Sequence, residues 1–257
     1  MKYFGGCDVG STYTKAVILD ENGKMVADTT IRSKINSEQS AIAAMEEVCK
    51  QAGLKDSKEL EYLIGTGYGR NKVPFADENI SEISCHAMGV HVTDPSVKAI
   101  IDIGGQDVKG ISIDTDGTVK NFAMNDKCAA GTGRFLEIMA DRLGISQQQM
   151  ADLARSGEPT KISSMCTVFA ESEVISLIGR GEPRENIARG VIDSVVSRVA
   201  TMAGQAAGAP YYLTGGLCEN AFVVERLGEL LGSPVTTSPQ ARFAGAIGAA
   251  VRARALV

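Results

Sequence analysis

Residues 7–23 read CDVGSTYTKAVILDENG, and residues 101–117 read IDIGGQDVKGISIDTDG. The two stretches align without a gap and are identical at five positions, which pair Asp8 with Asp102, Gly10 with Gly104, Lys15 with Lys109, Asp20 with Asp114, and Gly23 with Gly117. In each copy a strand pattern ends near an Asp, a glycine turn follows, and two further strands are joined by a polar turn that ends in glycine. The chain is therefore expected to contain an internal duplication.

Helix and strand patterns alternate along the rest of the chain. The expected helices cover residues 38–52, 79–92, 131–143, 146–155, 167–178, 184–207, 219–231 and 241–254. The expected strands cover residues 60–64, 97–103, 211–214 and 234–237. Strands that alternate with helices indicate an α/β fold. With the duplication, they predict two similar domains at residues 1–95 and 96–239, and a last helix at about 240–257 that packs back on the first.

The composition excludes several classes of partner. The formal net charge of −5 argues against binding to nucleic acid or to an anionic membrane through a broad positively charged surface. No apolar stretch approaches the roughly 20 residues that span a bilayer, and the N-terminus lacks a signal-peptide pattern. A cytoplasmic location is expected, in which the six scattered cysteines stay reduced.

The turn after each Asp is a candidate phosphate site. Backbone N–H groups converge in such turns, and glycine permits both the tight geometry and the close approach of a phosphate. A carboxylate at the end of the strand holds Mg²⁺ through water, which makes Asp8 and Asp102 the candidate magnesium and catalytic carboxylates. The predicted nucleotide-binding residues of the two loops are Gly10, Ser11, Thr12, Lys15, Gly104 and Gly105.

The alternative is that both loops are ordinary hairpin turns, for which Asp at a sharp bend is well suited. The presence of two such loops in one chain favours the interpretation that both bind the phosphates of ATP. A third glycine turn, Thr214–Gly216, follows a strand pattern and precedes a helix, where a nucleoside fits against the helix N-terminus. Gly215, Gly216 and Asn220 are its candidate contacts, although such a turn also occurs in any α/β fold.

Two of the cysteines, Cys128 and Cys166, each precede a predicted helix. The helix dipole favours a thiolate at that position, and thiolates are the ligands of iron–sulfur clusters. A four-iron cluster needs four of them, which two copies of this chain would supply about a two-fold axis. Buried or merely reactive cysteines remain the alternative.

Seven motifs give the chain a resemblance to a known family. They are DVGSTYTK (8–15), TGYGR (66–70), SEISCHAMG (81–89), DIGGQD (102–107), MNDKCAAGTGRF (124–135), CTVFAESEVIS (166–176) and LTGG (213–216). Together they resemble the activator ATPases of (R)-2-hydroxyacyl-CoA dehydratases, to which the ATPase subunits of benzoyl-CoA reductase are close relatives. The resemblance covers nearly the whole chain.

The resemblance implies the duplicated two-domain fold of actin, Hsp70 and sugar kinases, with ATP in the interdomain cleft. It implies a homodimer with one [4Fe–4S] cluster, ligated by Cys128 and Cys166 of both copies, and further nucleotide contacts at Gly131, Thr132 and Gly133. It also implies that ferredoxin or flavodoxin donates an electron, which ATP hydrolysis helps deliver to the dehydratase. Gln106 or Asp107 is expected to orient or polarise the attacking water, with Mg²⁺ neutralising charge.

Three other functions are compatible with the nucleotide motifs. An ATPase subunit of a benzoyl-CoA reductase shares all of the motifs. A small-molecule kinase shares the phosphate loops, but it gives no reason for two cysteines at helix starts. A non-redox protein that ATP switches between shapes would be colourless and insensitive to air.

Overall fold

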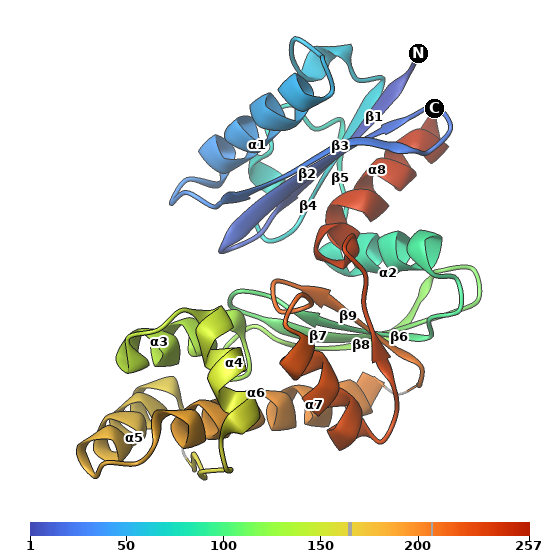
Figure 1. Cartoon of the computed structure of the whole chain (residues 1–257). Helices are drawn as coiled ribbons and strands as arrows, with labels where there is room; N and C mark the ends of the chain where they lie inside the picture. Colours follow the sequence, from blue (N-terminus) through green and yellow to red (C-terminus); the bar gives the residue numbers. More distant parts are fainter. Residues whose placement is uncertain (164–165, 207) are drawn as a thin grey trace. The chain divides into compact units, whose positions relative to one another are not determined.

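The computed structural model describes residues 1–163, 166–206 and 208–257. The chain divides into two compact units, the first made of residues 1–98, 113–121 and 240–257, and the second of residues 99–112 and 122–239. Each unit contains helices and one five-stranded sheet (Figure 1). No described helix combines the length and the apolar character that crossing a lipid bilayer requires.

The sheet of the first unit has the strand order β3-β2-β1-β4-β5. Its strands are β1 (Tyr3–Val9), β2 (Tyr13–Asp20), β3 (Met25–Arg32), β4 (Tyr62–Thr66) and β5 (Glu78–Asn79). The first three strands form the predicted antiparallel meander, and β4 pairs with β1 in parallel. The helices of this unit are α1 (Ser37–Gln51), α2 (Glu82–Thr93) and α8 (Ala244–Leu256).

Both faces of the first sheet are covered, because apolar residues occupy consecutive positions of β2. Ala16 and Ile18 belong to one core with α1, whereas Val17 and Leu19 belong to another with α8. Successive side chains of a strand point to opposite faces, so an uninterrupted apolar run predicts burial on both sides. Figure 1 shows α1 and α8 on the two faces.

Helices α2 and α8 approach each other so closely that glycine is required at the contact. A Cβ atom on Gly248 of α8 would lie 1.8 Å from the carbonyl oxygen of Cys85 in α2. In the same contact, a Cβ on Gly89 of α2 would lie 1.9 Å from the carbonyl oxygen of Ala244 in α8. Backbone atoms cannot move aside as the end of a flexible side chain can, so this close helix spacing requires glycine at both positions.

We therefore expect Gly248→Ala to destabilise the protein by about 3 kcal/mol, since the added methyl group must push two packed helices apart. Urea unfolding of the full chain measures the effect. Gly204→Ala is the matched control, because Gly204 lies in a helix with no atom within 4 Å of an added Cβ. Alanine should leave stability unchanged or raise it there. Equal losses in the two variants would contradict the packing argument.

The sheet of the second unit has the order β10-β9-β6-β7-β8. Its strands are β6 (Ala99–Ile103), β7 (Val108–Ile113), β8 (Val119–Asn125), β9 (Tyr211–Gly215) and β10 (Val235–Thr236). Its helices are α3 (Gly133–Leu143), α4 (Gln147–Ser156), α5 (Thr167–Gly179), α6 (Arg184–Ala206) and α7 (Ala221–Leu231). Taken from β8 to β10, this order repeats that of the first sheet from β3 to β5. The predicted duplication is thus confirmed and includes the fourth and fifth strands.

Several predicted boundaries were wrong. Residue 79, expected to begin a helix, belongs to strand β5, and α2 begins at Glu82. Helix α7 begins at Ala221 rather than at residue 219, because Asn220 accepts a hydrogen bond from the backbone N–H of Val223 and so caps it. Residue 207, the last of the predicted helix 184–207, lies outside the described residues.

Candidate functional site

The first loop places a buried carboxylate beside a lysine at the end of β1. Asp8 is opposite Lys15 in the antiparallel pair, and Lys15 Nζ lies 3.3 Å from Asp8 Oδ2. The backbone N–H of Gly10 donates to the carbonyl oxygen of Tyr13 over 3.2 Å, which closes the turn. Ser11 is exposed and Thr12 is half-buried, so both hydroxyl groups are open to a ligand.

The second loop repeats this construction. Asp102 is opposite Lys109, and Lys109 Nζ lies 3.0 Å from Asp102 Oδ2. The N–H of Gly104 donates to the carbonyl oxygen of Asp107 over 2.9 Å. A Cβ on Gly104 would lie only 1.9 Å from Asp107 Oδ1, so the carboxylate of Asp107 lies directly over the glycine turn.

A threonine–glycine pair lies next to each Asp, on the neighbouring parallel strand. Asp8 pairs with Thr66, and Asp102 pairs with Thr214. The hydroxyl of Thr214 donates to Asp102 Oδ1 over 2.9 Å. The following residues, Gly67 and Gly215, both have positive φ, at 88° and 85°. The sequence analysis assigned the second pair to the nucleotide site but quoted the first only within the motif TGYGR (66–70), although Thr-Gly after a strand is the same signal in both places.

The second unit brings three predicted nucleotide segments together. The N–H of Gly133 donates to the carbonyl oxygen of Gly104 over 3.0 Å, and the N–H of Arg134 to that of Gly105 over 2.9 Å. The N–H of Gly216 donates to the carbonyl oxygen of Ile103 over 3.2 Å. Residues 131–133 and 215–216 therefore both adjoin the loop that follows β6. Asn220 caps α7, which commits its side-chain oxygen to the protein's own backbone.

The six cysteines fall into two groups by exposure. Cys7, Cys49, Cys85 and Cys218 are buried, whereas Cys128 is half-buried and Cys166 is exposed. Burial raises the pKa of Cys49 and that of Cys85 to about 11. Burial, with the charge of Asp8 as a smaller cause, also raises the pKa of Cys7 well above its ordinary value. The two cysteines singled out in the sequence are thus the two that solvent reaches.

We expect iodoacetamide at pH 8 to modify Cys128 and Cys166 and to spare the buried cysteines of the folded, metal-free protein. The thiolate is the reactive form, and a pKa of about 11 leaves very little of it at pH 8. Peptide mass spectrometry identifies the adducts, and the urea-unfolded chain, which should react at all its cysteines, is the control. Modification of Cys49 or Cys85 as fast as of Cys166 would contradict this assignment.

The two accessible cysteines lie in different settings of the second unit. Cys166 is the N-cap residue of α5, as the sequence predicted for a helix start. Cys128 lies in the loop before α3, ahead of that helix's N-cap residue Thr132. Among the described residues, no three His, Cys, Asp or Glu side chains are grouped as a metal site needs. One copy of the described chain therefore does not present a complete ligand set.

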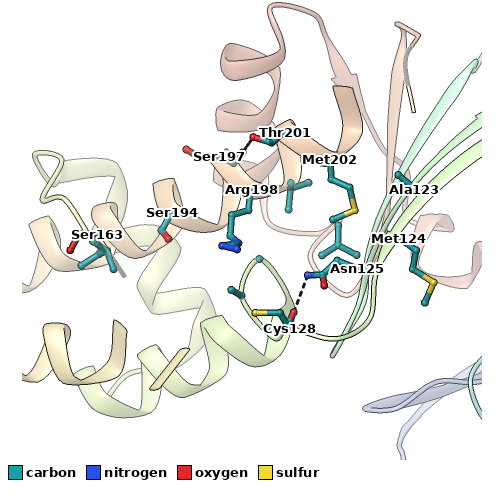
Figure 2. Close-up of a pocket in the computed structure, with 15 residues that line it drawn as sticks. Ala123, Met124, Asn125, Cys128, Ser163, Ser194, Ser197, Arg198, Thr201 and Met202 are labelled. Carbon is teal, nitrogen blue, oxygen red and sulfur yellow. Dashed lines mark hydrogen bonds between the residues drawn. The ribbon is translucent and has the colours of Figure 1, made fainter. Parts of the chain in front are cut away.

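A cavity of about 510 Å³ adjoins Cys128 (Figure 2). It lies between β7 and β8, the loop that carries Cys128, and helix α6, from which Ser194, Arg198 and Met202 line it. Figure 2 shows the Arg198 side chain extending from α6 toward the Cys128 loop. Asn125 Nδ2 donates to the carbonyl oxygen of Cys128 over 3.0 Å. This cavity was not predicted, because only the packing of α6 brings residues from the middle of that helix next to the Cys128 loop.

The chain is similar to known proteins over its whole length. It is 44% identical over 253 residues to the activator of lactoyl-CoA dehydratase from Anaerotignum propionicum, covering 98% of this chain and 97% of that one. The structure of (R)-2-hydroxyglutaryl-CoA dehydratase component A from Acidaminococcus fermentans matches with a TM-score of 0.94, at 42% identity, over 100% of this chain and 99% of that one.

The activator of 2-hydroxyisocaproyl-CoA dehydratase from Clostridium difficile, solved with bound ADPNP, matches with a TM-score of 0.93, at 37% identity, over 99% and 95% of the two chains. A ROK family glucokinase from Streptomyces griseus shares the fold alone, with a TM-score of 0.63 at 14% identity over 98% and 99% of the two chains. The predicted fold of actin-like ATPases and sugar kinases is confirmed. The model of the BadF/BadG/BcrA/BcrD ATPase family matches residues 6–253, and the chain therefore belongs to that family.

Proposed function

We propose that the protein is the activating ATPase of a 2-hydroxyacyl-CoA dehydratase, which hydrolyses ATP to deliver a low-potential electron to that enzyme. The observation that carries the proposal is the combination, in one chain, of two glycine turns with a buried Asp–Lys pair and two solvent-accessible cysteines. A kinase needs only the loops. The similarity to dehydratase activators over nearly the entire chain supports the same function.

Each of the two loops, residues 8–12 and residues 102–107, is proposed to bind phosphate groups of ATP. The turns offer backbone N–H groups, and Ser11 and Thr12 add hydroxyl donors. Asp8 and Asp102 would hold Mg²⁺ through water, a ligand set of oxygen atoms that suits this ion. Gln106, which is exposed in the second loop, would orient the attacking water, and Asp107 would accept its proton.

Cys128 and Cys166 are proposed to ligate one [4Fe–4S] cluster that two copies of the chain share. Thiol ligands fit such a cluster, and two accessible cysteines per chain supply the four that it needs. The cluster, when bound, supplies one-electron transfer. The positive charge of Arg198 beside Cys128 suits an anionic group there.

The exposed apolar side chains of α5 support the homodimer. Directly after Cys166, Val168 is 65% exposed and Phe169 is 68% exposed, and Ile175 in the same helix is 51% exposed. Apolar side chains that gather on one surface element are typical of protein–protein contacts. Pairing of two copies through α5 would cover these side chains and bring two Cys166 residues toward one another.

The remaining partners follow from the same proposal. Ferredoxin or flavodoxin would supply the electron, and the dehydratase would receive it in a transient complex. The protein would work in the cytoplasm, where its free thiols stay reduced. The two ATPase domains would be residues 1–95, with the helix at about 240–257, and residues 96–239.

Phosphate release without any acceptor tests the ATPase. We expect the anaerobically purified protein to convert ATP to ADP and inorganic phosphate at a steady rate, and added sugars or carboxylic acids to leave that rate unchanged. A malachite-green assay measures the phosphate, and mass spectrometry searches for phosphorylated acceptors. Phosphate that appears only on an added acceptor would identify a kinase instead.

A further inference from the structure

Lys109 stands at the centre of a buried cluster of charges in the second unit. Its side chain is only 2% exposed, and its Nζ lies 3.0 Å from Asp102 Oδ2. The same Nζ donates a hydrogen bond to Asp107 Oδ2. Asp102 also accepts a hydrogen bond from Thr214. One ammonium group thus joins the carboxylate at the end of β6 to the carboxylate that lies over the glycine turn.

The first repeat lacks this second carboxylate. Lys15 contacts Asp8, and its side chain is 16% exposed. The residue that corresponds to Asp107 there is Tyr13, which is exposed and has no charge. Both repeats therefore contain the Asp–Lys pair, and only the second repeat has a further carboxylate, that of Asp107, in contact with the lysine. Folding of the strand pair does not require this further carboxylate, because the first repeat forms the same antiparallel pairing without one.

A gain in folding stability does not explain why Lys109 is buried between two carboxylates. Burying an ammonium group costs several kcal/mol, and pairing it with carboxylates does little more than offset that cost. The pairing does, however, restrict where Asp107 can lie. Its side chain is 21% exposed, and one of its oxygens is bound to Lys109. Within the described parts of the chain, Oδ1 has no hydrogen-bond donor and lies over Gly104. Asp107 thus presents one fixed, available oxygen at the turn.

We propose that Lys109 is a positioning residue for ATP hydrolysis, which holds Asp107 Oδ1 at the place where the attacking water gives up its proton. This inference rests on the proposed function, since it assigns the second loop to hydrolysis. The water oxygen forms a bond to the γ-phosphorus while the bond from that phosphorus to the β,γ-bridging oxygen breaks. The proton of the water passes to Asp107 and then to the released phosphate, and ADP leaves.

The test compares Lys109→Met, which is similar in length and uncharged, with Lys120→Met, a control on the exposed face of the same repeat. Loss of a positioned base lowers kcat without changing the binding of ATP. We expect kcat of the full-length Lys109→Met protein to fall about 100-fold. The KM for ATP and the affinity for a fluorescent ATP analogue should change less than about three-fold, and Lys120→Met should behave as the wild type. An unchanged kcat, or an equal loss of nucleotide affinity, overturns the proposal.

A second comparison remains informative if Lys109→Met fails to fold. Asp107→Asn and the double variant Asp107→Asn with Lys109→Met both lack the proposed base, and the double variant keeps the total charge of the original cluster. If Lys109 acts through Asp107, the two variants have the same kcat. If the double variant is slower than Asp107→Asn by a further factor of about 100, Lys109 acts independently and the proposal is wrong.

The controls separate this inference from the function on which it rests. A wild-type protein that releases no phosphate from ATP contradicts the proposed function itself. A wild-type protein that hydrolyses ATP, and whose Lys109→Met variant does so equally well, contradicts only the role of Lys109.

Discussion

The Cys166→Ser variant is expected to contain no iron above background when it is purified anaerobically, whereas the wild type should contain about four iron atoms per pair of chains. A serine hydroxyl stays protonated at neutral pH and is a poor ligand for iron, so removing Cys166 from both copies leaves only half of the thiolates. ATP binding should be unchanged, because Cys166 caps α5 and lies in none of the nucleotide segments. Iron analysis and the visible absorption of the cluster measure the loss.

The same result is expected for Cys128→Ser, and Cys49→Ala is the matched control. Cys49 is buried, and burial raises its pKa to about 11, so it is a packing residue and its loss should leave the iron content unchanged. If the Cys166→Ser protein keeps its brown colour and its iron, the ligand assignment is wrong. Equal iron loss in Cys49→Ala would point to general unfolding instead.

The Asp102→Asn variant is expected to hydrolyse ATP at least 100-fold more slowly than the wild type, an effect typical of losing one charged group in a phosphoryl-transfer site. Asp102 is 3% exposed and accepts hydrogen bonds from both Lys109 and Thr214. Asparagine keeps the shape of the side chain but removes the charge that would hold Mg²⁺. Steady-state phosphate release over a range of Mg²⁺ concentrations measures the change.

Asp114→Asn is the control for this variant. Asp114 occupies the other Asp position that the two repeats share, but its side chain is 55% exposed and its ion-pair partner, Lys120, lies 3.8 Å away. Surface ion pairs of this kind contribute little, so the ATPase rate should stay within a factor of two of the wild type, as roughly expected for an exposed position. An Asp102→Asn rate as high as that of Asp114→Asn would exclude Asp102 from the site.

The repeated sheet could be predicted because its signals are local. Alternating apolar residues, an Asp at the strand end and a glycine in each turn all act within a few residues, so they appear in the sequence as a visible repeat. Strand β10 (Val235–Thr236) lies within the expected strand 234–237, whereas strand β5 (Glu78–Asn79) is too short for a periodic pattern to define. The sequence pattern predicts a helix that begins at residue 79, whereas a two-residue strand such as β5 depends on its pairing with the neighbouring strand β4.

The candidate site could be predicted only in part, for a similar reason. The turns were recognisable from residue type, and the accessible cysteines from their places before helices. The contact between Gly133 and Gly104 joins segments that are distant in sequence, as does the approach of Arg198 to the Cys128 loop. Such contacts arise from the packing of α3 and α6. The ion pair between Asp107 and Lys109 was not predicted, because it depends on how the second turn folds.

Electron delivery to a purified 2-hydroxyacyl-CoA dehydratase, measured with and without ATP under strict anaerobiosis, tests the central claim most directly. The iron-loaded protein, reduced by dithionite or ferredoxin, should activate the dehydratase only while ATP is being hydrolysed, and a non-hydrolysable ATP analogue should not replace ATP. The Cys166→Ser protein should fail in the same assay while still binding ATP. Full activation by an iron-free monomer, or by the reduced protein without any ATP, would contradict the account.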